Sequence, residues 1–176
     1  MENKIQNILL IGYDSNIGLG VLSCLRNQGY DFFLLTHNTR NAAKYSRFLK
    51  KTFYYHAEQD SLKDKIISIV KEYAIDFIMP YDELEIRDVT LHKEELTKYA
   101  ACVLGTDPVN FDIGIHKLHL AKFLTAKGIP CPPFATLDNI EQQEQLIKEV
   151  GFPLLLKPVR MASGRMIHFI SMTTIK

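Results

Sequence analysis

Short continuous runs of apolar residues recur along the first hundred residues of this chain, often closed by glycine or proline. Runs of this length are typical of strands that are buried on both faces of a parallel sheet. The pattern predicts strands at Asn7–Gly12, Asp31–Thr36, Thr52–Tyr55, Ile75–Pro80 and Ala101–Gly105.

Apolar residues at helical spacing occupy the stretches between these runs. Leu62–Tyr73 carries Ile66, Ile69 and Val70 at intervals that place side chains on one face of a helix. Further helices are predicted around Val21–Leu25 with a stop at Gly29, at Asn41–Leu49 and at Glu83–Tyr99. Because strands alternate with helices, we expect an α/β fold with a mostly parallel sheet and right-handed crossovers.

The order of the elements changes near Thr106–Pro108. The remaining chain predicts a helical stretch ending at Gly128, a proline-rich linker at 130–133, a strand at Phe134–Leu137, a helix at Asn139–Val150, and strands at Leu154–Val159 and Met166–Ile170. We therefore expect two domains, a Rossmann-like parallel-sheet domain at 1–110 and a smaller αβ unit at 111–176.

Composition excludes several classes of protein. The 176 residues are 47% hydrophobic and 23% charged, which is a globular balance rather than a disordered one. The net charge of +1 gives no field that would attract nucleic acid or an acidic membrane. The first apolar run is too short for a membrane span, and three scattered cysteines predict reduced thiols. We expect a cytoplasmic protein with neither nucleic acid nor membrane as partner.

The turn from Gly12 to Gly20 follows the first predicted strand and opens a helix. A helix start at this edge of a doubly wound sheet favours anions, so Gly12, Asp14 and Ser15 are candidate ligand-binding residues. The spacing is not G-x-G-x-x-G, and no acidic residue closes the second strand. The competing interpretation, a tight turn with glycines for close packing, is therefore the favoured one.

Acidic residues follow the fourth predicted strand. Asp82 and Glu83 lie where such sheets bind ligands, and their carboxylates could hold a substrate amine or a metal ion. The alternative is that Asp82 caps the next helix while its acidic neighbours complement the helix dipole. Both roles are compatible with the same residues.

Two lysines and a small-residue turn in the last third of the chain suggest a phosphate site. Lys117 lies in the first turn of a predicted helix, where a cation opposes the helix dipole unless an anion binds there. Lys157 ends an apolar strand, so we expect its stem to start inside and its ammonium group to emerge at the sheet edge. The turn at Ser163 and Gly164 offers backbone N–H groups to phosphate oxygens.

The chain resembles the ATP-grasp superfamily over nearly its whole length, and especially ligases similar to the large subunit of carbamoyl phosphate synthetase. His116-Lys117 matches the family's Asp-Lys helix start, and Gly128–Pro132 matches its G-I-P-x-P linker. Gly151–Pro158 matches its strand of pattern G-[FY]-P-hydrophobic-K-P. His116 and His119, one helical turn apart, are otherwise expected to be packing or surface residues.

The resemblance implies the identity of the ligands. In the family, the residues matching Lys117 and Lys157 contact ATP phosphates, and a glycine-rich loop, here containing Ser163 and Gly164, covers the triphosphate. The complete enzyme would use ATP and Mg²⁺ to join a small-molecule carboxylate to an amine through an acyl phosphate, and a homodimer is left open. The family's adenine and magnesium residues come later than Lys176, so these 176 residues alone are expected not to catalyse.

Two other functions stay open. The first is a regulatory module that binds NAD(P) or another nucleotide at the turn from Gly12 to Gly20, with Arg40 near a 2′-phosphate. The second is a non-catalytic scaffold that has kept the fold without the chemistry.

Overall fold

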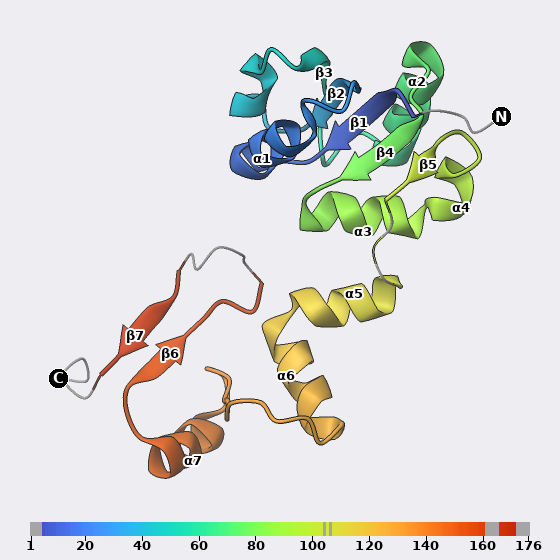
Figure 1. Ribbon diagram of the computed structural model, residues 1–176. Helices are drawn as coiled ribbons and strands as arrows, with labels where there is room; N and C mark the ends of the chain where they lie inside the picture. The colour runs from blue at the N-terminus through green and yellow to red at the C-terminus, as the bar shows by residue number, and fades with distance from the viewer. Residues whose placement is uncertain (1–4, 104, 106, 161–165, 172–176) are drawn as a thin grey trace. The chain divides into compact units, whose positions relative to one another are not determined.

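The computed structural model describes residues 5–103, 105, 107–160 and 166–171 (Figure 1). The chain divides into two compact units, Met1–Pro108 and Val109–Lys176, here called unit 1 and unit 2. The predicted phosphate-loop residues Ser163 and Gly164 lie outside the described residues.

Unit 1 is built on a five-stranded sheet in which every pair of neighbouring strands is parallel. The strands are β1 (Asn7–Ile11), β2 (Asp31–Thr36), β3 (Leu49–Tyr54), β4 (Phe77–Pro80) and β5 (Ala101–Cys102). Their order across the sheet is β3-β2-β1-β4-β5. The α/β class and the parallel sheet predicted from the sequence are confirmed.

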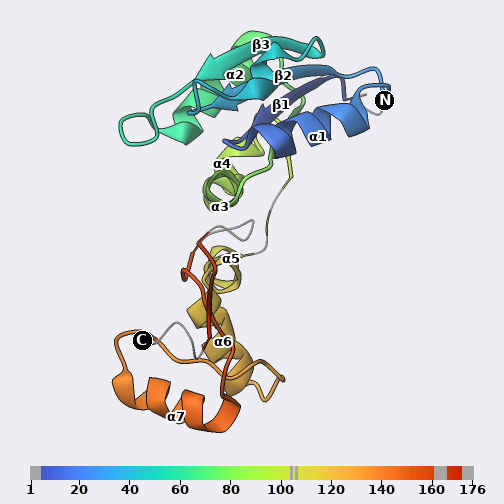
Figure 2. The ribbon, with the colours of Figure 1, turned by 90° about the vertical axis from the view of Figure 1, so that its left-hand side faces the viewer.

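Helices cover both faces of this sheet. They are α1 (Ser15–Leu25), the 3₁₀ helix η1 (Ala42–Tyr45), α2 (Leu62–Tyr73), α3 (Glu83–Leu91) and α4 (Lys93–Leu96). One face packs against α1 and η1, and the other against α2, α3 and α4 (Figure 1, Figure 2).

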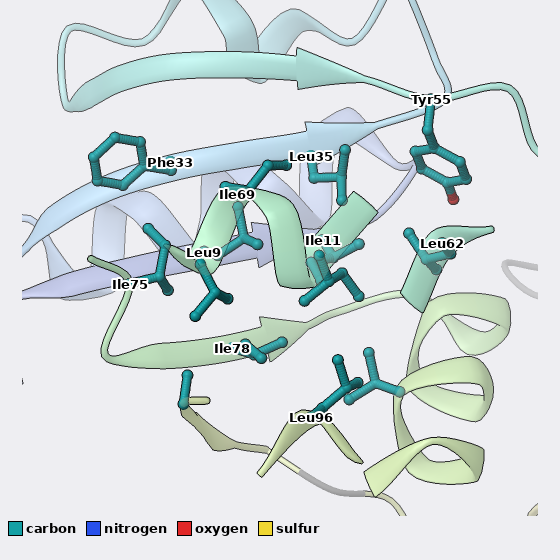
Figure 3. Close-up of a cluster of buried hydrophobic side chains, with 14 residues drawn as sticks. Leu9, Ile11, Phe33, Leu35, Tyr55, Leu62, Ile69, Ile75, Ile78 and Leu96 are labelled. Carbon is teal, nitrogen blue, oxygen red and sulfur yellow. The ribbon is translucent and has the colours of Figure 1, made fainter. Parts of the chain in front are cut away.

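The central strand β1 contributes to two hydrophobic cores because its side chains alternate between the faces. Ile8 and Leu10 pack with Leu22 of α1. Leu9 and Ile11 join the larger core against α2, α3 and α4, which Figure 3 shows in close-up. Tyr55 stands at the end of this larger core toward which the strand arrows point (Figure 3).

Local signals explain the bounds of α2. Its four buried side chains are Leu62, Ile66, Ile69 and Val70, all on the face predicted from their spacing. The side chain of Ser61 accepts a hydrogen bond from the backbone N–H of Asp64 at 3.3 Å and so caps the first turn. Ala74 ends the helix in the left-handed conformation, with φ of 48°.

The predicted helix Asn41–Leu49 is wrong beyond a single short turn. Only Ala42–Tyr45 is helical, and Leu49 already belongs to β3, where it pairs with Phe32. The Asn41 side chain bonds the N–H of Ala43 at 3.0 Å, an interaction that competes with a longer helix. Pairing with β2 therefore overrides the local helical pattern.

The predicted helix Glu83–Tyr99 is interrupted at His92, which separates α3 from α4. The backbone of His92 departs from helical geometry with φ of −101° and ψ of 17°. Its ring Nδ1 lies 3.0 Å from the backbone oxygen of Asp88, one helical turn earlier. The side chain thus competes for a backbone acceptor inside the helix.

Unit 2 contains three helices and a two-stranded antiparallel sheet among its described residues. They are α5 (Pro108–Ile115), α6 (Lys117–Ala126), α7 (Ile140–Val150), β6 (Leu154–Leu156) and β7 (His168–Ile170). The predicted strand Phe134–Leu137 is wrong, because the carbonyl groups of Thr136 and Leu137 accept hydrogen bonds from the Gln143 side chain instead of from a strand.

The core of unit 1 generates a stability prediction. Ile66 is fully buried, so Ile66→Ala should lower the free energy of unfolding by about 2–5 kcal/mol through lost burial and a residual cavity. The same change at Ile17, which is 46% exposed on α1, should cost less than about 1 kcal/mol. Urea denaturation followed by circular dichroism measures both. Equal losses would mean that the described core is not what stabilises unit 1.

Candidate functional site

Unit 2 places Lys117 at the first position of α6, as predicted from the sequence. His116 caps this helix, its ring Nδ1 accepting a hydrogen bond from the backbone N–H of His119 at 3.3 Å. The two imidazole rings stack with centroids 3.7 Å apart. His116 thus does what an aspartate or serine does at other helix starts, without adding a negative charge to this end of α6.

A backbone hydrogen bond joins the start of α6 to the segment that follows β6. The N–H of Lys117 donates to the carbonyl oxygen of Val159 at 2.9 Å. Lys157 lies two residues before Val159 in that segment, so both predicted phosphate lysines belong to chain segments that meet here. Lys157 as a whole residue is exposed.

Positive charge accumulates around this junction. Partial desolvation and the positive charges of His119, Arg160 and Lys117 lower the pKa of His116. A lowered pKa in a histidine surrounded by cations is the response expected where like charges crowd. The arrangement is suited to an anion with several negative charges.

Asp82 binds the turn between β1 and α1 rather than capping its own helix. Its Oδ2 accepts hydrogen bonds from the backbone N–H groups of Tyr13 and Asp14 at 2.5 and 2.7 Å. Asp82 occupies the N-cap position of α3 but makes no side-chain capping bond there. Glu83, the first residue of α3, is exposed.

The start of α1 is occupied by the chain's own side chains. Asp14 Oδ1 accepts hydrogen bonds from the N–H groups of Asn16 and Ile17 at 2.7 and 3.2 Å. Ser15 Oγ accepts one from the N–H of Ala42 at 2.9 Å, which ties α1 to η1. The N–H groups of Asn16 and Ile17, which could have met a phosphate, are therefore already bound to the Asp14 carboxylate.

The glycines of this turn make room for Tyr81. A Cβ atom added at Gly12 would lie 2.3 Å from the Tyr81 ring, and one added at Gly18 would lie 3.0 Å from its hydroxyl oxygen. The Tyr81 hydroxyl donates a hydrogen bond to the carbonyl oxygen of Gly12 at 3.0 Å. These contacts support the close-packing interpretation of the glycine pattern.

A buried polar network lies beyond the ends of β2 and β3. Glu85 is only 2% exposed, and its Oε1 accepts a hydrogen bond from the Tyr55 hydroxyl at 3.0 Å. His37 Nδ1 lies 3.0 Å from that hydroxyl and 3.3 Å from Glu85 Oε1. Because the tyrosine hydrogen goes to Glu85, the Tyr55 oxygen is left to accept from His37 Nδ1–H. Tyr13 stacks on the His37 ring with centroids 5.0 Å apart.

Burial dominates the electrostatics of this network. Desolvation raises the pKa of Glu85, and the charge of Asp82 acts in the same direction. The Tyr55 hydrogen bond and the nearby His37 act in the opposite direction, since both favour the ionised carboxylate. Desolvation and the Glu85 charge also raise the pKa of Tyr55, which keeps its hydroxyl a donor.

A cavity of about 300 Å³ opens beside this network. His37, Tyr55 and Glu85 contribute to its lining, as do Asp88 and His92 of α3 and its C-terminal end. Perturbed ionisable groups that converge on a cavity are a common feature of functional sites.

Sequence reasoning missed Tyr55 and His37, and it included Glu85 only as one of several carboxylates after the fourth predicted strand. A signal for Glu85 existed, because it lies four residues before the buried Val89 and so places a carboxylate on the apolar face of α3. No comparable signal marked Tyr55, which looks like the end of an edge strand in the sequence. Its partner lies thirty residues away, and only the fold brings the two together.

Within the part of the chain that the structure describes, no group of three or more histidine, cysteine, aspartate or glutamate side chains is arranged to hold a metal ion. The carboxylate of Asp82, a candidate for such a role, is directed at backbone N–H groups.

Comparison with solved structures identifies the fold. The N5-carboxyaminoimidazole synthetase of Staphylococcus aureus, solved with ADP, is similar over 94% of this chain and 41% of its own, with a TM-score of 0.66 and 15% identity. The biotin carboxylase domain of the Hydrogenobacter thermophilus 2-oxoglutarate carboxylase, solved with MgADP, ADP and bicarbonate, is similar over 95% and 38%, with a TM-score of 0.62 and 17% identity. Both have the ATP-grasp fold.

Sequence comparison finds similarity to carbamoyl phosphate synthases. The C-terminal section of the carbamoyl phosphate synthase large chain of Methanopyrus kandleri is 23% identical over 173 residues, which is 93% of this chain and 31% of that protein. The chain thus spans about a third of that relative's length. No protein-family model matches the chain. The predicted resemblance to ATP-grasp ligases of the carbamoyl phosphate synthase type is confirmed.

The glycine contacts generate a pair of opposite predictions. Gly12→Ala should destabilise the protein by about 1–3 kcal/mol, because the new methyl group meets the Tyr81 ring. Gly20→Ala should stabilise it by about 0.5–1 kcal/mol, since that helical position is open and alanine favours the helix. Thermal and urea denaturation of the two variants test this. A neutral Gly12→Ala would show that Tyr81 does not occupy the described position.

The raised pKa of Glu85 generates a pH prediction. Below the ordinary pKa of 4.5, Glu85 is protonated in both folded and unfolded chains. As the pH rises from there toward the folded pKa, the unfolded chain loses this proton first, so stability falls. Relative to Glu85→Gln, the wild-type protein should therefore lose stability as the pH rises above 4.5 toward the raised folded-state pKa, at up to roughly 1.4 kcal/mol per pH unit.

Urea unfolding of both proteins across that pH range measures the effect. The glutamine keeps an acceptor for the Tyr55 hydroxyl, and His37 is present in both proteins, so the comparison isolates the carboxylate. A stability difference that is independent of pH would contradict the raised pKa.

Proposed function

We propose that this chain forms the N-terminal portion of an ATP-dependent carboxylate–amine ligase that acts through an acyl phosphate. Unit 1 would be the Rossmann-like domain that precedes an ATP-grasp domain, and unit 2 the first part of the ATP-grasp domain. The observation that carries the proposal is the hydrogen bond from the Lys117 N–H to the Val159 carbonyl. It joins the segments of Lys117 and Lys157, the two residues expected to meet ATP phosphates.

The residues around this junction fit a nucleotide triphosphate. Lys117, Lys157 and Arg160 are cationic, and desolvation together with the nearby charges of His119, Arg160 and Lys117 lowers the pKa of His116. Phosphate oxygens would be held by charge-assisted hydrogen bonds from the two lysines. Ser163 and Gly164 stay predicted contacts of the triphosphate. For Mg²⁺, the described residues offer no grouped ligands, so we assign none of them to the metal.

The proposed chemistry begins when a carboxylate oxygen of the substrate attacks the γ-phosphorus of ATP. The bond from that phosphorus to the bridging oxygen breaks, which releases ADP and leaves an acyl phosphate. An amine then attacks the acyl carbon and expels inorganic phosphate to form an amide. The lysines would stabilise the negative charge on the transferring phosphoryl group, a role that depends on position more than on bond making.

The relatives set the scope of this proposal. Because the chain spans about a third of the Methanopyrus protein, the complete reaction is proposed for a protein that also contains the rest of an ATP-grasp domain. ADP and MgADP are bound in the two solved neighbours, which supports ATP and Mg²⁺ as the cofactors here. The biotin carboxylase domain was solved as a dimer, and a homodimer stays a prediction for this chain.

The cytoplasmic location also stays a prediction. The three cysteines, Cys24, Cys102 and Cys131, are free thiols in the structure. Among the helices that the structure describes, none has both the length and the apolar character that crossing a bilayer requires.

The alternative of an NAD(P)-binding module is not favoured by the geometry at the turn after β1. The backbone donors there already bind Asp14 and Asp82, and two carboxylates beside them would repel a pyrophosphate. Arg40, the candidate partner of a 2′-phosphate, is exposed. The third possibility, a non-catalytic scaffold, predicts that even the complete protein binds no nucleotide.

Substitution of the lysines tests the proposed phosphate site. In a protein that carries this chain and the rest of an ATP-grasp domain, Lys117→Ala and Lys157→Ala should each weaken ATP binding. Loss of a charge-assisted hydrogen bond typically costs ~1.5–3 kcal/mol, or roughly tenfold to hundredfold in affinity. Adenosine binding should change much less, because it lacks the phosphates. Calorimetric titration with both ligands provides the measurement.

The matched control is Lys148→Ala, which removes an exposed lysine from the last turn of α7 and should leave both affinities unchanged. Equal losses for ATP and adenosine would mean that the lysines support folding or the adenine pocket. Unchanged ATP affinity in both variants would show that they are ordinary surface lysines.

A further inference from the structure

The cavity beside Glu85 has no role in the proposed phosphate chemistry, yet it combines features of a ligand site. It lies at the carboxyl edge of the parallel sheet, where α/β proteins bind ligands. One wall carries the carboxylate of Glu85, whose side chain is only 2% exposed. Such a carboxylate is costly unless a positive charge or several hydrogen bonds accompany it.

Tyr55 and His37 hold this carboxylate from one side. The two contacts to Glu85 Oε1, at 3.0 and 3.3 Å, fix the orientation of the side chain. The Tyr55 hydroxyl is neutral, so it orients Glu85 without cancelling its charge. Two more carboxylates, those of Asp60 and Asp88, also line the cavity.

Asp88 supplies an independent observation. Its Oδ1 atom is buried and accepts no hydrogen bond within the described residues. His92 Nδ1 lies 3.3 Å from it, but the same ring nitrogen is 3.0 Å from the backbone oxygen of Asp88. Asp88 as a residue lines the cavity, so its carboxylate adds negative charge to the wall that carries Glu85.

The cavity lining carries three carboxylates and one lysine, together with the imidazoles of His37 and His92, which lie 3.3 Å from Glu85 and Asp88 respectively. Lys63 is the one lysine or arginine among the described residues of its lining, and its ammonium group is 2.8 Å from Glu95 and 3.5 Å from Asp64. That lysine is therefore committed to carboxylates other than Asp60, Glu85 and Asp88. An excess of negative charge favours a cationic ligand and repels carboxylates and phosphates.

We propose that this cavity binds the ammonium group of a small amine, with Glu85 and Asp88 as its anionic partners. The assignment of that amine as the substrate of the ligase rests on the proposed function, whereas amine binding itself does not. A volume of about 300 Å³ is at the small end of ligand sites, which suits a molecule of amino-acid size rather than a nucleotide. Leu62 and Leu84 provide apolar surface for a short carbon chain.

The test is a titration of the complete 176-residue chain with propylammonium chloride, followed by two-dimensional NMR at about pH 7.5 without nucleotide. Saturable shifts are expected for the amides of residues 84–92 and for Tyr55. Sodium propionate and propanol, which match the carbon chain without the positive charge, should give no saturable shift there. Glu85→Gln should weaken propylammonium binding at least about tenfold, because a charge-assisted contact is lost.

Two further variants keep the result interpretable. Asp88→Asn, at a half-exposed position that tolerates substitution better, should also weaken binding if Glu85→Gln fails to fold. Glu94→Gln, an exposed acid at the start of α4, should leave binding unchanged. Circular dichroism establishes that each variant is folded.

Three results would overturn the proposal. They are the absence of saturable shifts with propylammonium, equal shifts with propanol, and undiminished binding in both Glu85→Gln and Asp88→Asn. Failure of the ligase proposal is distinguishable, because it would appear as loss of the lysine effects on ATP binding while the amine titration stayed positive. If the lysine substitutions weakened ATP binding but propylammonium gave no saturable shift, the amine site would be ruled out and the phosphate site supported.

Discussion

The pairing of β1 with β2 on one side and β4 on the other is the constraint on which unit 1 depends. Four consecutive residues of β1, Ile8–Ile11, are buried, which is feasible only when the backbone groups are satisfied on both edges. Because β1 contributes alternate side chains to both cores, a shift of its register would exchange the contents of the two faces.

The same strand order determines where polar groups can gather. The chain leaves β1 toward β2 and later returns to β4 on the opposite side, so the sheet has a switch point between β1 and β4. Sheets of this type usually bind ligands in the crevice at that point. Here Tyr81 and Asp82 occupy it with their own contacts to Gly12 and the following turn. The open cavity lies to the side, where Tyr55 and Glu85 meet.

Much of the fold could be predicted because the strands of unit 1 are dense apolar runs and α2 has regular spacing. The short η1 could not, since its sequence is compatible with a helix and only pairing of Leu49 with β2 decides against it. Of the candidate site, Lys117 was predictable from its place at a helix start. The Glu85–Tyr55 pair was not, because it depends on the approach of residues that are distant in the chain.

The position of the Tyr81 ring has an evolutionary consequence. Gly12 directly follows β1 and Gly18 lies within α1, yet both face the same aromatic side chain. A relative with a smaller residue in place of Tyr81 would have space for side chains at both positions, whereas a relative that keeps the ring would not. The residues at positions 12, 18 and 81 should therefore covary among homologues. Glycine at positions 12 and 18 would then indicate a large side chain at position 81 rather than a bound nucleotide.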